Sequence, residues 1–238
     1  FGYLLYRDHK IEKAFMLHGS GRNGKSKTDE LIKSFIGPKN CSNISLHKLE
    51  TDNFSCSELF HKLANINGDI NNTALKETGM FKQLTGGDQV SANRKFKDYI
   101  HFKNYAKLIF NANELPRTYD KSTAFFQRWV LLDFPYTFLS QKEIDSMDEK
   151  DKVNVKISDP SIIDKITTED ELSGLLNWAL IGLERLLNQR DFSDTPGTKD
   201  IKSRWIRKSD SFSSFLMERV EEEWSGFISK QDLQREYP

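Results

Sequence analysis

The sequence predicts an α/β fold built around a mainly parallel sheet. Short apolar runs alternate with stretches of helical periodicity as far as Pro135, which is the pattern of repeated strand–helix units. The first apolar run leads into a glycine-rich segment, "HGSGRNGKSK" (residues 18–27), and a helical pattern follows it. The chain has 238 residues, of which 37% are hydrophobic, so it can bury one substantial core, with or without an appendage.

The first part of the chain contains three candidate strands and one helix. The run "KAFMLH" (13–18) predicts a strand, and the apolar residues within 31–36 recur at helical spacing until Gly37 and Pro38 end the helix. Alternation in "NISLHKL" (43–49) predicts a second strand, and the more polar "LANINGDI" (63–70) predicts a third. The glycine-rich segment therefore joins a strand to a helix.

The next part continues the alternation. Residues 73–88 predict a helix that ends at the glycine pair 86–87, and 89–102 predict a hairpin with a basic centre. The runs "YAKLIFNAN" (105–113) and "FQRWVLLDF" (126–134) predict two further strands. Strands and helices in this order indicate a mainly parallel sheet.

The remainder is more heterogeneous. Residues 140–170 are charge-rich without clear periodicity until Ile162, which indicates a mobile surface segment, and 171–189 predict an amphipathic helix. Its apolar face comprises Leu172, Leu175, Leu176, Ala179, Leu180, Leu183, Leu186 and Leu187. We expect a linker over 192–200, then two helices within 209–224 and 229–238, the second capped by Ser229.

Composition limits the classes of function. Lys and Arg together number 35, as do Asp and Glu, so the net charge is zero and any nucleic-acid contact must come from a local patch. Two cysteines, Cys41 and Cys56, cannot form a disulfide framework and suit a reducing interior. No apolar run approaches ~18 residues and no secretory signal is visible, so we expect no membrane contact. A chain that starts at Phe1 without Met and stops at Pro238 is expected to be part of a longer protein.

The glycine-rich segment has the pattern of a phosphate-binding loop, Gly19-x-x-x-x-Gly24-Lys25-Ser26. At average residue frequencies it arises by chance in roughly 1 in 100 chains of this length. Its glycines let backbone N–H groups turn inward toward phosphate oxygens at a helix N-terminus. In such a loop the lysine reaches the β- and γ-phosphates and the serine hydroxyl binds Mg²⁺. We therefore expect ATP and Mg²⁺ to bind Gly19, Ser20, Gly21, Arg22, Asn23, Gly24, Lys25 and Ser26.

Four later motifs narrow the class of nucleotide-binding protein. They are Asp69 at the end of a candidate strand, "TGGD" (85–88), "NELP" (113–116) and Arg128. In this order they resemble superfamily 3 helicases, and specifically the C-terminal helicase part of phage-, plasmid- and poxvirus-type primase-helicases. The resemblance runs from about Ala14 to Pro135, resumes over 171–187, and extends to a final segment similar to the start of that family's winged-helix tail.

The resemblance implies an AAA+-like P-loop NTPase core with a C-terminal helical and partial winged-helix segment. It divides the chain into an ATPase core (1–138), a linker with the C-terminal helix of the motor (139–191), and the start of a truncated winged-helix-like tail (192–238).

The resemblance also assigns roles in catalysis. Lys25 would contact the phosphates, Asp69 would hold Mg²⁺ or its water together with Ser26, and Asn113 would be the polar sensor of the γ-phosphate or lytic water. Arg128 would be the finger that reaches a neighbouring subunit's nucleotide, with Arg117 as a weaker rival. The family often has adjacent acidic residues where Asp69 is followed by Ile70, so the group that orients the lytic water stays open. From the residues alone, Asp69 and Asn113 also suit strand-end turns, and Arg128 suits a surface ion pair.

A basic stretch supplies the local patch. Between Ala92 and Lys107 the basic residues are Arg94, Lys95, Lys97, Lys103 and Lys107, Asp98 is the only acid, and Phe96 and Tyr99 interleave them. Such residues suit backbone phosphates and stacked bases. The resemblance places Lys95, Phe96 and Lys97 near the tip of a central-channel hairpin that binds DNA. The alternative is a solvated hairpin whose charges resist aggregation.

These observations together predict an ATP-dependent DNA helicase motor of a replicative primase-helicase. We expect a ring, a homo-hexamer, that moves on single-stranded or forked DNA, with a primase on the same full-length chain. Its location would be the cytoplasm, or the host-cell interior for a viral or plasmid protein. The alternatives are a motor that acts on RNA or in packaging, a P-loop initiator or assembly ATPase that binds DNA without unwinding it, and a small-molecule kinase.

Overall fold

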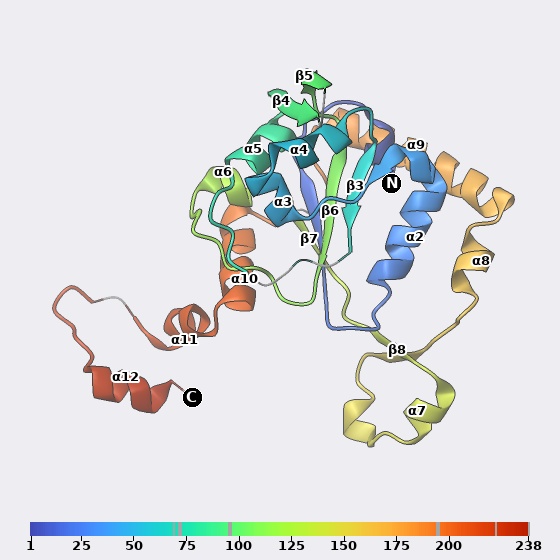
Figure 1. Cartoon of the computed structure of the whole chain (residues 1–238). Coiled ribbons are helices and arrows are strands. Elements are labelled where there is room, and N and C mark those ends of the chain that lie inside the picture. Colours follow the sequence, from blue (N-terminus) through green and yellow to red (C-terminus); the bar gives the residue numbers. More distant parts are fainter. Residues whose placement is uncertain (69, 71–72, 95–96, 194–195, 222, 238) are drawn as a thin grey trace.

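The computed structural model describes residues 1–238 except 69, 71–72, 95–96, 194–195, 222 and 238, with the backbone alone at 53 and 97. Its centre is a five-stranded parallel sheet with the strand order β2-β3-β6-β1-β7 (Figure 1). The strands are β1 (Ala14–His18), β2 (Cys41–Ser42), β3 (Ala64–Asn67), β6 (Lys107–Ala112) and β7 (Trp129–Asp133). The predicted parallel α/β sheet is thus confirmed.

The strand order puts β1 at a crossover point. β1 pairs with β6, where Phe15 lies opposite Ile109, and with β7, where Ala14 lies opposite Trp129. After β1 the chain crosses to β2 and β3, then returns to β6 beside β1 and continues to β7 on its other side. Ligands of open α/β sheets bind outside the carboxyl ends of strands at such a reversal. The carboxyl end of β1 is also where the glycine-rich segment begins.

Helices cover both faces of the sheet. One face is covered by α1 (Gly2–Leu5), α2 (Lys25–Ile36) and α9 (Glu169–Gln189), and the other by α3 (Leu46–Thr51), α5 (Gly79–Gly86), α6 (Thr123–Phe126) and α10 (Thr198–Ser209) (Figure 1). Successive strand residues serve opposite faces, so Met16 joins the core cluster with α3, α5, α6 and α10, whereas Leu17 packs with Ile32 of α2.

An aromatic cluster fills the larger core. The Phe81 ring stacks on Trp129 with centroids 4.6 Å apart, and Trp205 of α10 lies 5.1 Å from Trp129. The Trp205 indole N–H donates to the Pro116 carbonyl at 2.8 Å. The helix α10 is therefore part of the core, although its first residues fall in the predicted linker (192–200) and the sequence analysis assigned no element to 201–208.

The remaining elements project from this body. β4 (Gln89–Arg94) and β5 (Lys97–Lys103) form the predicted antiparallel hairpin. A lobe comprising residues 135–162 contains β8 (Thr137–Leu139), α7 (Gln141–Asp145), the 3₁₀ helix η3 (Glu149–Asp151), β9 (Val155–Ile157) and the start of α8 (Ile162–Ile166). At the C-terminus, α11 (Ser211–Arg219) and α12 (Lys230–Glu236) lie away from the sheet, and Ser229 caps α12 as expected (Figure 1). Three short elements complete the list: α4 (Asn53–Cys56) and the 3₁₀ helices η1 (Pro38–Asn40) and η2 (Ser57–Leu59).

Two predicted elements are wrong in kind or extent. Residues 43–49 are not a strand: Ser45 accepts a hydrogen bond from the Lys48 N–H and starts α3. The predicted helix over 73–88 begins only at Gly79, because Leu75 bridges to Thr118 and its N–H donates to the Arg117 carbonyl. The segment 140–170, predicted to be a mobile surface segment, contains several short elements. The division at residues 138 and 191 stays a prediction.

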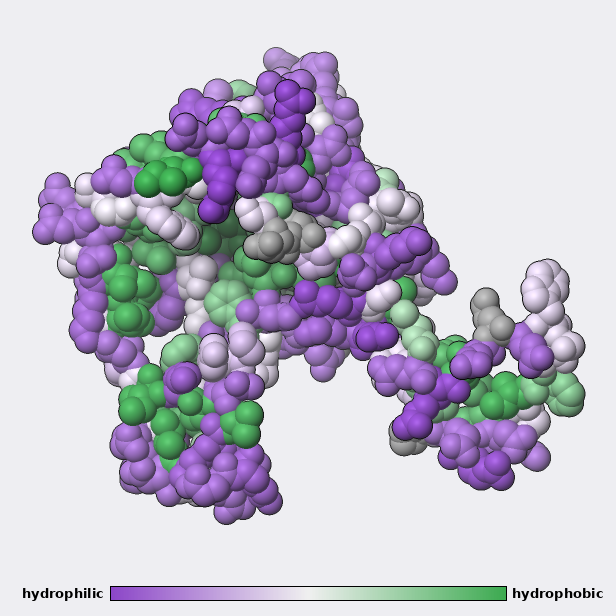
Figure 2. All heavy atoms as spheres, turned by 180° about the vertical axis from the view of Figure 1, so that it is seen from behind, coloured by the Kyte–Doolittle hydropathy of each residue, from purple (hydrophilic) through white to green (hydrophobic). Residues whose placement is uncertain are grey.

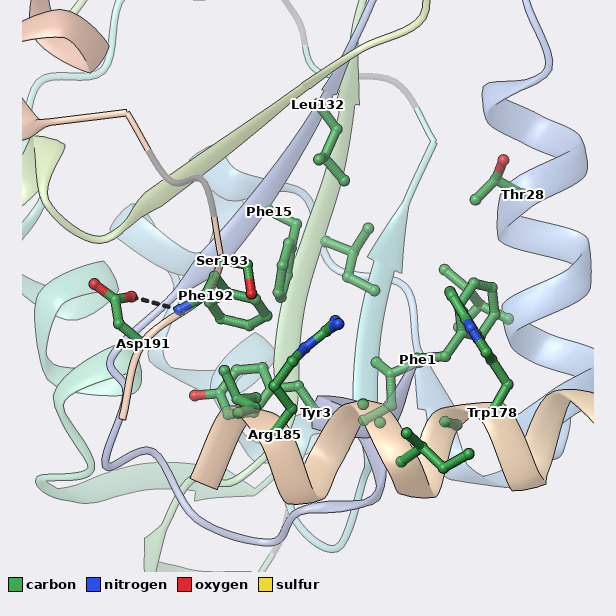
Figure 3. A pocket seen from close by; sticks show the side chains of 18 of the residues that line it. Phe1, Tyr3, Phe15, Thr28, Leu132, Trp178, Arg185, Asp191, Phe192 and Ser193 are labelled. Atoms are coloured by element: carbon green, nitrogen blue, oxygen red, sulfur yellow. Dashed lines mark hydrogen bonds between the residues drawn. The ribbon is translucent and has the colours of Figure 1, made fainter. Parts of the chain in front are cut away.

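The long helix α9 confirms the amphipathic prediction only in part. Of its predicted apolar face Ala179 and Leu186 are buried, whereas Leu176, Leu180 and Leu187 remain 41–48% exposed. Between α9 and the sheet lies an apolar cavity of about 340 Å³. Figure 3 shows α9 along one side of this cavity, with Trp178 and Arg185 rising from it and Phe15 opposite. Among the described residues, no helix combines the length and hydropathy needed to cross a bilayer.

Candidate functional site

The segment Gly19–Gly24, here called the glycine loop, joins β1 to α2. Gly24 has a φ of +92°, a left-handed conformation that glycine adopts without strain, and it directly precedes α2. The Gly19 N–H donates to the Ala112 carbonyl at the end of β6. The loop therefore starts against the carboxyl ends of two adjacent strands and ends at the N-terminus of a twelve-residue helix.

The glycines of the loop differ in how much space they leave for a side chain. A Cβ at Gly19 would lie 2.5 Å from the Phe134 carbonyl oxygen and would also clash with the Asn23 side chain. A Cβ at Gly21 would meet nothing within 4 Å. Gly19 is thus needed for close backbone approach, whereas Gly21 faces open space.

We predict that Gly19→Ala lowers the free energy of unfolding by about 1–3 kcal/mol, because the backbone at Phe134 must shift to admit the methyl group. Gly21→Ala, the matched control, should leave it within about 0.5 kcal/mol of wild type. Urea unfolding followed by circular dichroism measures both. Equal midpoints for the two variants would contradict the tight packing at Gly19.

The Lys25 side chain lies inside the loop. Its Nζ donates to the Gly19 carbonyl at 2.5 Å, to Asn23 Oδ1 at 3.2 Å and to Asn113 Oδ1 at 3.0 Å. Asn113 follows β6, so the structure brings together two predicted site residues that are 88 positions apart. An ammonium group and an amide therefore converge at the carboxyl edge of the sheet, beside the N-terminus of α2.

The donors present here suit an anion and a hard cation. Backbone N–H groups at the start of α2 and the Lys25 ammonium favour phosphate oxygens. The exposed Ser26, in the first turn of α2, lines the same cavity as Gly68. Oxygen ligands such as its hydroxyl are those that Mg²⁺ prefers. Asp69, the other predicted metal ligand, lies outside the described residues, and in the part of the chain that is described no group of three or more His, Cys, Asp or Glu side chains could hold a metal.

A buried acid that the sequence analysis missed lies beneath this site. Asp29 of α2 is 5% exposed, and its Oδ2 accepts a hydrogen bond from Asn111 Nδ2 at 2.6 Å. Within the described residues, Asp29 Oδ1 and Asn111 Oδ1 have no hydrogen-bond partner. Burial raises the pKa of Asp29 to about 6, although the bond from Asn111 opposes the shift. Asp29 is four residues after Lys25 and on the same helix face, and this spacing was the signal in the sequence that could have placed it near the site.

This pKa predicts a pH-dependent stability. A carboxyl group with a folded-state pKa near 6 and an ordinary value of 3.8 binds more protons in the folded state, so its contribution is lost as pH rises through 4 to 6. Asp29→Asn should remove this loss, which lowers the free energy of unfolding of the wild type by at most about 3 kcal/mol between pH 4 and pH 7. Urea unfolding at several pH values measures the difference between variant and wild type. Parallel pH profiles would show that Asp29 does not titrate in this range.

A second charged cluster flanks the other side of the loop. Asp133, at the end of β7, accepts hydrogen bonds from Arg204 and Lys208 of α10, and His18 Nδ1 lies 3.3 Å from its Oδ1. Partial burial and the nearby Lys208 lower the pKa of His18. Partial burial acts to raise the pKa of Asp133, but Lys208 and Arg204 outweigh it and hold that pKa below its ordinary value. His18 is therefore positioned by α10, in agreement with a structural role.

The lobe of residues 135–162 covers the outer side of the loop. A cavity of about 800 Å³ lies between them, lined by the glycine loop from Gly21 onward, by Asn113, and by Phe138, Ile157, Pro160 and Ile162. Arg22 donates to both carboxylate oxygens of Glu143 in α7, at 2.7 and 2.9 Å. Bonds from Arg22 and from Ser140 lower the pKa of Glu143 to about 2. The loop and the lobe thus form the two walls of one cavity.

The structure places Arg128 far from the glycine loop of its own chain. Arg128 precedes β7, whereas the loop follows β1, and these parallel strands put the two at opposite edges of the sheet. At ~3.3 Å per residue, five residues of β1 separate them by about 16 Å. Arg128 Nη2 pairs with Glu12 at 2.9 Å, and its side chain is 12% exposed. The rival Arg117 is 62% exposed and lies near Asp210.

The predicted nucleic-acid hairpin is only partly described. Lys95 and Phe96 lie outside the described residues, and Lys97 is described by its backbone at the start of β5. Tyr99 is 67% exposed, and Arg94 lies over the Phe60 ring. The prediction that Lys107 belongs to the basic patch is wrong. Lys107 is fully buried, and its ammonium donates to the Asp8 and Tyr105 carbonyls.

Comparisons with known sequences give a family match and viral relatives. Residues 17–128 match a family described as of unknown function (DUF5906). The chain is 31% identical over 140 residues to "Putative helicase L207/L206" of Acanthamoeba polyphaga mimivirus, covering 56% of this chain and 14% of that protein. It is 25% identical over 221 residues to "Putative helicase 121R" of Invertebrate iridescent virus 3, covering 84% of this chain and 23% of that protein. The chain thus spans less than a quarter of the length of either relative.

A solved structure gives a second likeness. The apo C-terminal region of NrS-1 (305–718) aligns with a TM-score of 0.54 and 12% identity, covering 99% of this chain and 56% of that chain. At this identity the likeness concerns the fold alone. The chain therefore shares the fold of the NrS-1 C-terminal region and is similar in sequence to viral proteins that carry helicase names.

Proposed function

We propose that this chain is the motor part of an ATP-dependent DNA helicase of the superfamily 3 type. The observation that supports this most is the convergence of Lys25 and Asn113, 3.0 Å apart, where the glycine loop meets the end of β6. A cation and a polar side chain beside a helix N-terminus suit the terminal phosphates of a nucleoside triphosphate. The helicase names of the viral relatives support a nucleic-acid substrate.

The residues of the site divide the work of hydrolysis. The backbone amides of the glycine loop and Lys25 would hold the phosphates, and Asn113 would orient the γ-phosphate or the lytic water by a hydrogen bond. Ser26 and Asp69 would hold Mg²⁺, which when bound neutralises charge on the phosphates. Phosphoryl transfer needs this positioning and charge neutralisation more than covalent chemistry by the protein.

The position of Arg128 favours an assembly in which subunits share sites. Because Arg128 lies at the sheet edge opposite its own loop, its guanidinium could serve only the nucleotide of another subunit. A ring, a homo-hexamer, would place one subunit's Arg128 beside the next subunit's loop. Glu12, which holds Arg128 in the single chain, would then exchange it for phosphate.

The hairpin of β4 and β5 is the proposed DNA contact. It joins the sheet just before β6 and so lies at the edge opposite the glycine loop (Figure 1). Lys95, Phe96 and Lys97 would contact single-stranded DNA, with the exposed Tyr99 available for stacking. A primase on the same full-length chain, and a forked substrate, complete the proposal.

The test is the rate of ATP hydrolysis against protein concentration, with and without single-stranded DNA, followed by strand displacement on a fork. A rate per subunit that rises with concentration and with DNA, together with unwinding, is the expected result. Hydrolysis without unwinding would favour an initiator or assembly ATPase. Phosphate transfer to a small molecule, with no response to DNA, would favour a kinase.

A further inference from the structure

The cavity between the glycine loop and the lobe has two chemically different walls, here called its polar end and its apolar end. One end presents the loop, Lys25, Ser26 and Asn113, which are polar or charged. The other end presents the side chains of Phe138, Ile157, Pro160 and Ile162. Its volume of about 800 Å³ is in the range of cavities that enclose a whole small molecule rather than one anion.

The apolar end is not part of the core. Phe138 is 37% exposed and Ile157 is 63% exposed, and each lies on a strand of only three residues. Viewed from behind, hydrophobic atoms gather on the lobe (Figure 2), where Tyr136, Phe138, Val153 and Ile157 are exposed. A lobe this small cannot bury these side chains by itself.

Phe138 is held directly against the glycine loop. Its N–H donates to the Arg22 carbonyl at 2.8 Å, and a Cβ placed on Gly24 would lie 3.7 Å from its ring. Two hydrogen bonds from Arg22 to Glu143 tie the loop to α7, and a capping box between Ser140 and Glu143 fixes the start of that helix. The aromatic ring is therefore presented in a fixed place beside the phosphate-binding end.

We infer, given the proposed function, that the apolar end of this cavity binds the base of the nucleotide, which stacks on the Phe138 ring. A nucleoside triphosphate carries its charge at one end and a flat, weakly polar ring at the other, as this cavity does. Base–aromatic stacking tolerates any base because every base has a π-face. Ile157, Pro160 and Ile162 complete the apolar surface.

Stacking, rather than hydrogen bonding by side chains, carries this recognition. Among the described residues that line this end, Asp159 is the one carboxylate, and it already accepts hydrogen bonds from the Ser161 N–H, the Ser161 hydroxyl and Lys165 Nζ. Ser158 donates its N–H to the Leu139 carbonyl. Phe138 is therefore the residue whose loss should weaken nucleotide binding most at this end.

The test compares ATP with magnesium tripolyphosphate, which has the phosphates but no base. In competition against a fluorescent ATP analogue, Phe138→Ala should weaken ATP binding by about 5- to 150-fold. Tripolyphosphate binding should stay at the wild-type value. Tyr136→Ala is the matched control, because Tyr136 is an exposed aromatic of the same lobe whose ring faces Lys156 and not the cavity. It should change neither affinity.

Phe138→Trp gives a second readout, the fluorescence of the added indole, which does not depend on a loss of binding. This variant should bind ATP at least as well as wild type, and ATP should quench its added indole fluorescence, whereas tripolyphosphate should not. The difference spectrum against wild type removes the signal of the native tryptophans.

The outcomes separate this inference from the proposed function. Equal weakening of ATP and tripolyphosphate by Phe138→Ala, unchanged affinity for both, or no ATP-specific quenching in Phe138→Trp would overturn the base site. Wild-type protein that binds neither ligand would overturn the nucleotide site itself.

Discussion

Replacing Lys25 with alanine is expected to reduce ATP hydrolysis by at least about 100-fold, the effect of removing one preorganised charge-stabilising donor. Its ammonium lies between the Gly19 carbonyl and Asn113 Oδ1, where the terminal phosphates would bind in the proposed function. Phosphate release assays with excess ATP and single-stranded DNA measure the loss.

Lys10→Ala is the matched control for this prediction. Lys10 lies before β1, at the edge of the sheet opposite the glycine loop, is exposed and pairs with Asp8 at 3.7 Å. Its loss should leave hydrolysis unchanged, because exposed ion pairs contribute little. Circular dichroism confirms that both variants fold. Hydrolysis by Lys25→Ala at the wild-type rate would remove the glycine loop from the mechanism.

Arg128→Ala should lower hydrolysis by about 10³- to 10⁵-fold while nucleotide affinity stays close to wild type. The reason is that a guanidinium supplied by a neighbouring subunit acts mainly on the transition state. Mixing Arg128→Ala with Lys25→Ala protein should recover part of the activity, since some junctions then combine an intact loop with an intact arginine.

Glu12→Ala separates this role from a structural one. Glu12 pairs with Arg128 at 2.9 Å, so its removal breaks the ion pair but keeps the guanidinium. If Arg128 acts in hydrolysis, Glu12→Ala should keep most of the activity. If Arg128 only supports the fold, both variants should lose thermal stability and activity together. Full activity in Arg128→Ala would shift the assignment to Arg117.

The sequence predicted the elements that surround the glycine loop because their signals are local. A buried run before the loop, helical spacing after it and a stop at Gly37 gave β1 and α2. The pairing of Lys25 with Asn113 in one site came from the resemblance to superfamily 3 helicases, and the structure places the two side chains 3.0 Å apart. The predicted strand over 43–49 was wrong because periodicity over so few residues does not distinguish a strand from a helix.

Other features depend on tertiary contacts or on signals that were present but unused. The capping box of Ser140 and Glu143 marks the start of α7 in the sequence, and Ile201 with Trp205 has the spacing of one helix face. The burial of Lys107 could not be predicted, because it carries a charge that normally stays in water. For Asp29 the unused signal was its place on the same helix face as Lys25. The position of Phe138 beside Gly24 depends on how the lobe folds back.

The burial of Trp205 determines where this chain can be cut. Its indole lies against Phe125, Phe126 and Trp129, so removal of α10 would expose several aromatic rings to water at a cost of a few kcal/mol. By contrast, α11 and α12 bury none of their described side chains. A protease should therefore trim the chain back to the neighbourhood of Ser209 and stop there, and a shortened expression fragment that ends before Thr198 should aggregate.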